Sequence, residues 1–119
     1  MRKLVWLFMV TSLPAFAADF SGVWKVDGSI QDHPVTPTCT LKQADNLVTG
    51  SCTLLDGDKT ADVTGEVKEK QVTWRYKLDY QGTTYTLTYV GTLDSDTSIK
   101  GSVTADPSDT DGDFTAKKQ

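Results

Sequence analysis

Alternation of apolar and polar residues is the clearest pattern in this chain. In QVTWRYKLDY, residues 71–80, every second side chain is apolar or aromatic: Val72, Trp74, Tyr76, Leu78 and Tyr80. A period of two, rich in β-branched and aromatic residues, is typical of a strand with one buried face. TTYTLTYVG, residues 83–91, repeats the alternation after Gln81-Gly82, a pair that predicts a tight hairpin turn.

Turn-forming residues divide the rest of the chain into similar short segments. They occur at Asp45-Asn46, at Asp56-Gly57, at Glu69-Lys70 and in DSDTS, residues 94–98. This spacing leaves no room for a helix of ordinary length after the first residues. The sequence therefore predicts an all-β fold.

A weak internal repeat indicates how the strands are arranged. FSGVW, VTGSC, VTGEV, YVGTL and IKGSV share one form: apolar, any, Gly, any, apolar. FTAKK near the C-terminus keeps the apolar Phe114 but has Ala116 in place of the glycine. In each, the glycine shares a face with its apolar neighbours, which predicts inward, structural roles for Gly22, Gly50, Gly65, Gly91 and Gly101. Inward glycines occur where strands bend or backbones approach closely. We expect one antiparallel up-and-down meander that closes into a small barrel of about eight strands, with an open sandwich as the alternative.

Both cysteines of the chain lie in one predicted hairpin. If Asp45-Asn46 is a two-residue turn, Ala44 faces Leu47, and the same register places Cys39 directly opposite Cys52. The Cα atoms of such a non-hydrogen-bonded pair lie about 4.5 Å apart, within the range of a disulfide. A metal would need further ligands, and a redox pair usually has C-x-x-C spacing. We therefore predict a Cys39–Cys52 disulfide that staples this hairpin.

The first seventeen residues have the features of a secretory signal. Arg2 and Lys3 precede the apolar run LVWLFMV, and Ala15-Phe16-Ala17 matches the small-x-small pattern of a cleavage site. The apolar run is too short to span about 30 Å of hydrocarbon. We expect a cleaved signal over residues 1–17, a single barrel domain over residues 18–119, and a periplasmic or secreted protein that is not a lipoprotein.

The charge of the expected mature chain bears on its partners. Removal of residues 1–17 leaves ten basic and sixteen acidic residues, a formal charge of −6. An acidic chain without a basic cluster does not suit nucleic acid or an anionic membrane surface. We therefore expect no nucleic-acid partner.

Three short motifs resemble a known group of barrels. FSGVW resembles the G-x-W start of the lipocalin and avidin-like barrels, the calycin group; ADNLVTGSC resembles the avidin segment that ends in T-G-x-Y; and VTWRY resembles its V-x-W-K strand. The resemblance covers about residues 19–105. It implies that Trp24 packs at the closed end of a barrel, that Trp74 forms a ligand-contacting wall, and that Ser29 contacts the ligand.

The chain also departs from these families. Cys52 stands where avidins have a ligand-contacting Tyr, the lipocalin motif T-D-Y has no counterpart, and the late Trp and Asp of avidins are absent before Gln119. The resemblance therefore implies a barrel without implying biotin binding. It is nearer to small secreted bacterial barrels with similar T-G-x-V repeats.

The residues that acid–base or nucleophilic catalysis requires do not form a recognisable pattern. His33, the only histidine, precedes Pro34 in an expected loop without a nucleophile motif nearby. Glu66 and Asp79 alternate with inward residues, so both carboxylates are expected to face solvent. We predict a non-enzymatic protein without a cofactor.

One acidic segment is a weak candidate for calcium binding. Asp109, Asp111 and Asp113 occupy alternate positions around Gly112, and oxygen donors at such spacing suit a hard cation. The glycine lies one place early for an EF-hand, and no glutamate follows. A polar turn before the last strand is the favoured interpretation.

Two functions remain open from the sequence. The first is a binding module for a small apolar or amphipathic ligand, although aromatic residues can equally fill a core; the candidate residues are Trp74, Tyr76, Tyr85, Leu87, Tyr89 and, from the resemblance, Ser29. The second is an inhibitor or interaction protein that acts on a hydrolase through its surface or through a free N-terminus, ADFSG. The sequence does not name the ligand, the partner or the oligomeric state.

Overall fold

The computed structural model describes residues 19–54 and 59–119, apart from the side chain of Tyr80. Within these ranges it contains nine strands and no helix, which confirms the all-β prediction: β1 (Gly22–Ile30), β2 (His33–Val35), β3 (Thr38–Ala44), β4 (Leu47–Leu54), β5 (Lys59–Lys68), β6 (Gln71–Tyr80), β7 (Thr83–Ser95), β8 (Ser98–Asp106) and β9 (Thr110–Lys118). The predicted signal peptide over residues 1–17 and the predicted turn at Asp56-Gly57 lie outside the described residues.

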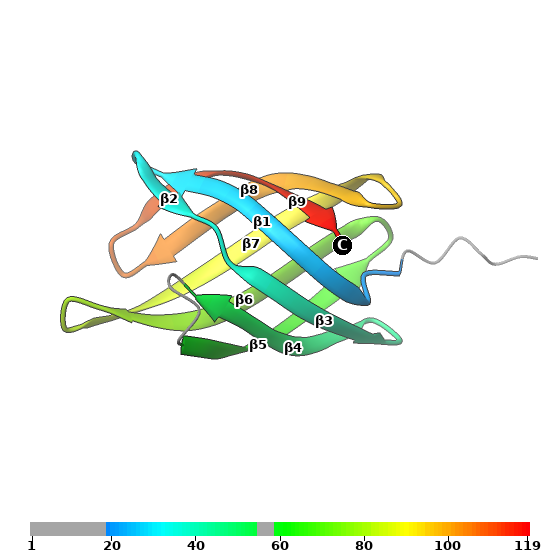
Figure 1. Ribbon diagram of the computed structural model, residues 1–119, viewed down its shortest axis with the longest axis horizontal. Helices are drawn as coiled ribbons and strands as arrows, with labels where there is room; N and C mark the ends of the chain where they lie inside the picture. The colour runs from blue at the N-terminus through cyan, green and yellow to red at the C-terminus, as the bar shows by residue number, and fades with distance from the viewer. Residues whose placement is uncertain (1–18, 55–58) are drawn as a thin grey trace, which may run out of the picture.

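The strands form one closed antiparallel barrel (Figure 1). Each strand from β3 to β9 pairs with the next, and β1 pairs with both β3 and β9. The closing ladder between β1 and β9 runs from Trp24 opposite Lys118 to Ile30 opposite Gly112. Eight strands therefore make the barrel, as predicted, and an open sandwich is wrong.

One strand, β2, is additional to the eight strands of the barrel; it is short and pairs with the end of β1. Gln31 and Asp32 both have positive φ, 49° and 72°, and make a two-residue turn that pairs Ile30 with His33. The prediction that His33 lies in a loop is therefore wrong, because this turn sends the chain back along β1. The side chain of His33 is exposed.

Two-residue turns set the hairpin registers as predicted. Ala44 faces Leu47, and Cys39 faces Cys52 in the β3–β4 ladder. The two cysteines form the predicted disulfide, with Cα atoms 3.9 Å apart. In the β6–β7 hairpin, Trp74 faces Tyr89, again as the register of a two-residue turn requires.

The core is made of the inward-facing residues of the strands. The largest fully buried side chains are Trp24, Trp74, Tyr89, Phe20, Leu41 and Ile99. Phe114 and Ala116 of the FTAKK segment are buried as well. Burying this set of apolar side chains is the main favourable contribution to the free energy of folding.

Glycines lie on the inward face where neighbouring strands come closest. Each of the five repeat glycines occupies an inward position of its strand. A Cβ built on Gly65 would overlap the carbonyl oxygen of Thr73 and lie 2.8 Å from the Cα of Trp74. A Cβ on Gly101 would likewise overlap backbone of β7. These contacts leave no room for a side chain.

We predict that Gly65→Val lowers the free energy of unfolding by about 1–3 kcal/mol or more, because the new side chain overlaps the β6 backbone. Thr64→Val, on the exposed outer face of the same strand, should change it by no more than about 0.5 kcal/mol. Urea unfolding followed by circular dichroism measures both. Equal midpoints for the two variants would contradict the inward placement of Gly65.

The disulfide generates a second prediction. Because Cys39 and Cys52 close a loop with a sequence separation of 13, replacing both by alanine should lower the free energy of unfolding by about 3 kcal/mol. A reducing agent should lower the urea midpoint of the wild type and leave that of the double variant unchanged. Insensitivity of the wild type to reduction would show that the staple does not stabilise the barrel.

Candidate functional site

The two ends of the barrel differ in how they are closed. We call one the plugged end; it contains Phe20 and the turn at Glu69-Lys70. The other, the hairpin end, contains the turns at Gln31-Asp32 and Gln81-Gly82. In Figure 1 the β6–β7 hairpin extends to the left at the hairpin end.

Phe20 closes the plugged end. Its side chain is fully buried, its N–H donates to Gln43 Oε1 at 2.9 Å, and its carbonyl accepts from Trp24 Nε1 at 2.9 Å. Ser21 Oγ accepts a further bond from the Gln43 N–H at 3.0 Å. Lys118 Nζ lies 5.4 Å from the centroid of the Trp24 ring, at cation–π distance.

This anchoring corrects one expectation from the sequence. Phe20 and Ser21 belong to the segment ADFSG, which was expected to be a free N-terminus able to insert into an enzyme. Both residues are tied to Gln43 instead. The reason is that Phe20 is the first apolar residue of the FSGVW repeat, so it is drawn into the core with Trp24. Trp24 thus lies at the end of the barrel where the resemblance placed it.

The middle of the barrel holds an aromatic cluster, which consists of Trp74, Tyr76, Tyr89 and Phe114. The rings of Trp74 and Tyr89 are stacked, with centroids 5.0 Å apart and an interplanar angle of 8°. Phe114 meets both rings edge-on, at 5.6 Å and 5.1 Å. Such stacked and edge-to-face contacts are favoured by the ring quadrupoles. Trp74 and Tyr89 are fully buried, so side chains fill the barrel at this level.

Polar atoms of the cluster are only partly paired. The hydroxyls of Tyr76 and Tyr89 lie 2.6 Å apart and share one hydrogen bond. Trp74 Nε1 is buried and has no hydrogen-bond partner among the described residues. A buried donor without an acceptor costs about 1–3 kcal/mol and calls for an explanation.

Burial also changes the titration of the two phenols. Desolvation raises the pKa of Tyr76 to about 12, opposed by its hydrogen bond with Tyr89. Desolvation raises the pKa of Tyr89 as well, and the neighbouring Tyr76 adds to the rise. Both groups therefore keep their hydrogens at neutral pH.

At the hairpin end, β5 and β6 part from one another. Their ladder stops at Thr64 opposite Arg75, so Tyr76–Tyr80 of β6 pair only with β7. A groove of about 400 Å³ lies at the parting and is lined by Thr60, Ala61, Asp62, Thr64, Arg75, Tyr76, Lys77 and Thr86. Tyr76 is the member of the aromatic cluster that borders this groove.

An ion pair marks the point where the strands part. Arg75 donates from Nη1 and Nη2 to the two carboxylate oxygens of Glu66, at 3.0 Å and 2.9 Å. This hydrogen bonding lowers the pKa of Glu66 and raises that of Arg75. The bidentate pair links β5 to β6 on the outer face, next to the last rung of their ladder.

Partly exposed apolar side chains also gather at the hairpin end. Leu78 and Tyr85 face each other across the hairpin and pack against the core, while Leu87 is buried beneath them. Val35 and Ala61 are partly buried at the same end. The predicted set Trp74, Tyr76, Tyr85, Leu87 and Tyr89 thus lies along one inward face of two paired strands.

Ser29 does not join this set. Its side chain is exposed, because Trp24, Val26 and Ile30 alternate with it along β1 and point inward. The resemblance implied that Ser29 contacts the ligand, but its side chain lies on the outer face of β1, away from the aromatic residues. The alternation of β1 already contained this information, whereas the resemblance relied on sequence position alone.

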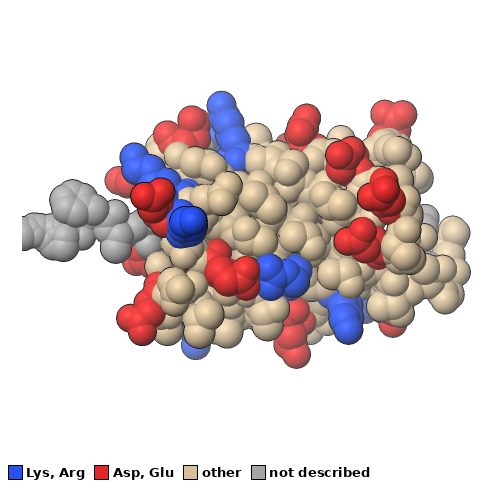
Figure 2. All heavy atoms as spheres, turned by 180° about the vertical axis from the view of Figure 1, so that it is seen from behind, with Lys and Arg blue, Asp and Glu red and all other residues tan. Residues whose placement is uncertain are grey.

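Acidic side chains gather toward the hairpin end, at the right of Figure 2. The β8–β9 connection and β9 supply four exposed carboxylates there: Asp106, Asp109, Asp111 and Asp113. In the part of the chain that the structure describes, no cluster of three or more potential ligands is arranged to hold a metal ion. The weak calcium candidate thus has no supporting geometry.

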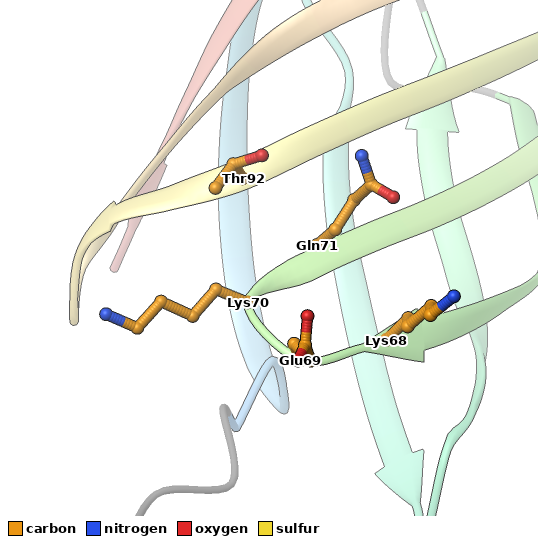
Figure 3. A pocket seen from close by; sticks show the side chains of 5 residues that line it. All are labelled: Lys68, Glu69, Lys70, Gln71 and Thr92. Carbon is orange, nitrogen blue, oxygen red and sulfur yellow. The ribbon is translucent and has the colours of Figure 1, made fainter.

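A second hollow lies outside the barrel at the plugged end. It measures about 570 Å³ and surrounds the β5–β6 turn; its lining residues are Lys68, Glu69, Lys70, Gln71 and Thr92. Figure 3 shows that these side chains spread apart rather than converge on one point. All five are exposed, so this hollow has no features of a binding site.

Comparisons with known proteins support the fold. No family model and no curated protein matches the sequence. Among solved structures, the chain is similar to a redesigned β-barrel, b11L5F_LGL, with a TM-score of 0.65, 18 % identity, and coverage of 92 % of this chain and 99 % of that chain. Within the described ranges, no helix has the length and apolar character needed to cross a bilayer.

Two further structural neighbours contain a small molecule. The redesigned β-barrel mFAP1 bound to DFHBI has a TM-score of 0.59, 14 % identity, and coverage of 82 % of this chain and 94 % of that chain. EF1p2_mFAP2b bound to DFHBI has a TM-score of 0.58, 16 % identity, and coverage of 83 % and 93 %. At these identities the likeness shows a small β-barrel fold.

The buried phenols lead to a prediction about pH. Because the folded state retains the protons of Tyr76 and Tyr89 above the ordinary value of 10.0, the unfolded chain releases them first. The free energy of unfolding should therefore be unaffected by these groups below pH 10 and fall as the pH rises from 10 toward 12.

Spectrophotometric titration of tyrosinate, with urea midpoints at each pH, tests this. A late ionisation step should be present in the wild type and absent from the Tyr76→Phe/Tyr89→Phe double variant, whose midpoint should also fall less. Ionisation of Tyr76 and Tyr89 near pH 10 in a chain that keeps its native circular dichroism would contradict the burial of the pair.

Proposed function

We propose that this protein is a non-enzymatic, extracytoplasmic binding module that holds a small apolar or amphipathic molecule at the hairpin end of its barrel. The G-x-W start and the closed barrel together support a place among calycin-like ligand-binding barrels. The Cys39–Cys52 disulfide fits an oxidising compartment, in agreement with the expected signal peptide.

The observation that carries this proposal is the parting of β5 and β6. It opens a groove of about 400 Å³ directly onto Tyr76, while Phe20 blocks the opposite end. Ligand sites are typically concave, with apolar walls and a few polar groups. The groove has polar residues at its rim, and Leu78 and Tyr85 provide apolar surface at the same end.

The filled level of the barrel limits where a ligand can sit. Trp74 and Tyr89 are stacked and fully buried, so the ligand does not lie between them. It packs instead against Tyr76 and the partly exposed inner face of the β6–β7 hairpin. mFAP1 and EF1p2_mFAP2b, which are bound to DFHBI, support the view that a barrel of this fold can accommodate a small molecule.

Fluorescence titration with N-phenyl-1-naphthylamine, an uncharged aromatic probe, tests the proposal. We expect saturable binding at one site per chain. Leu78→Ser should raise the Kd at least about fivefold, because it removes apolar contact at the hairpin end.

Leu93→Ser provides the matched control. Leu93 is an inward, partly buried leucine of β7 near the plugged end, so its replacement should leave the Kd within about twofold. Circular dichroism verifies that both variants are folded. Absence of saturable binding, or equal effects of the two substitutions, would refute a ligand site at the hairpin end.

A further inference from the structure

Among the described residues, two buried hydrogen-bond donors of the aromatic cluster have no acceptor. The Tyr76 and Tyr89 hydroxyls carry two hydrogens but share one bond, and no other described side chain or backbone group bonds to either hydroxyl. One O–H hydrogen is therefore left over. The N–H of Trp74 is the second unpaired donor. Tyr76, Tyr89 and Trp74 form one packed group, because Tyr89 contacts both other rings; we call these three residues the donor cluster.

The described part of the chain has no buried charged side chain beside the donor cluster. Among the described residues, the one buried side chain that is polar or charged, apart from those of the aromatic residues, is Ser98. It lies at the plugged end, where Lys117 donates to its hydroxyl at 3.0 Å. The raised pKa values of Tyr76 and Tyr89 keep both phenols protonated. The cluster thus has a donor surplus and no charge to neutralise an ion.

The surface around the hairpin end favours an uncharged ligand. The carboxylates of Asp106, Asp109, Asp111 and Asp113 are exposed at this end and repel anions. The groove itself is lined by Asp62 and Lys77, which have opposite charges, and by Arg75, which is paired with Glu66. An ion of either sign would also lose hydration inside a cluster without an opposite charge, which is costly. A neutral oxygen atom avoids both penalties and satisfies the spare donors.

We propose that the barrel recognises an uncharged molecule bearing a carbonyl or ether oxygen, which accepts a hydrogen bond from the donor cluster on the groove side, where Tyr76 lies. This inference rests on the proposed function and specifies its ligand class. The oxygen approaches from the groove, because Tyr76, although buried, is the member of the donor cluster that lines it. Trp74 supplies the second spare donor one stacked ring deeper.

A matched pair of probes isolates the oxygen. Acetophenone and α-methylstyrene have nearly the same shape, but the first has a carbonyl oxygen where the second has a methylene group. In competition with N-phenyl-1-naphthylamine on the full chain, acetophenone should bind at least about fivefold more tightly. In proton–nitrogen NMR spectra, acetophenone should shift the indole N–H signal of Trp74 and leave that of Trp24, which already donates to Phe20.

A conservative variant removes one hydroxyl of the cluster. Tyr76→Phe keeps the ring and its packing but removes the hydroxyl of the residue that lines the groove; Tyr89 keeps its hydrogen but does not line the groove. The affinity for α-methylstyrene should therefore be unchanged while the advantage of acetophenone falls to within about twofold. Thr88→Val, which removes a hydroxyl from the outward face of β7, should preserve the full advantage. The comparison is made within each folded variant, so a general change in stability does not affect it.

The outcomes separate this inference from the function on which it rests. Equal affinities for the two probes, or an advantage of acetophenone that survives Tyr76→Phe, would overturn the acceptor class; the groove would remain a site if N-phenyl-1-naphthylamine still binds. An unmoved Trp74 signal at saturating acetophenone would also overturn it and assign the spare donors to bound water. Failure of all three probes to bind would overturn both.

Discussion

Pairing of the first strand with the last is the interaction on which the rest of the structure depends. Once β1 and β9 are joined, every alternate residue of eight strands points into one narrow interior, and only complementary sizes can fill it. Large aromatic rings accordingly lie opposite glycines on the neighbouring strands: Trp74 is opposite Gly65, and Phe114 is opposite both Gly28 and Gly101. The repeat of glycines is therefore the counterpart of the aromatic residues, because each ring occupies space that a neighbour vacates.

The same closure makes the two ends of the barrel unequal. At one end, Phe20 and Gln43 complete the core with side chains and hydrogen bonds. At the other, the β6–β7 hairpin runs past its neighbours, so the backbone beyond Arg75 loses its partner on the β5 side. Packing at the first end stabilises the fold, whereas the second end leaves surface available for another molecule. Under the proposed function, stability and binding depend on different levels of one small barrel.

Local features of the sequence were sufficient for much of the fold. Two-residue turns fixed the registers that bring Cys39 to Cys52 and Trp74 to Tyr89. Once the turn is located, residues at equal distances on its two sides are paired. The parting of β5 and β6 had no local signal, because the Glu69-Lys70 turn predicts a ladder that continues past Arg75. The burial of Phe114 against Trp74 and the hydroxyl pair of Tyr76 and Tyr89 depend on how the barrel coils, which alternation does not specify. Ser29 was misplaced because resemblance was given precedence over alternation.

The pairing of β1 with β9 also determines when the barrel can form during synthesis. Thr110–Lys118 are synthesised after the other strands of the barrel, so a nascent chain that still lacks them cannot close it. The β3–β4 and β6–β7 hairpins involve near neighbours in sequence and can form early, but the contact that joins the ends spans almost the whole described chain. Until then, β1 and β8 present bare backbone edges that pair readily with other chains. A truncation that removes only β9 therefore leaves an open, aggregation-prone sheet, although nearly all of the core residues are still present.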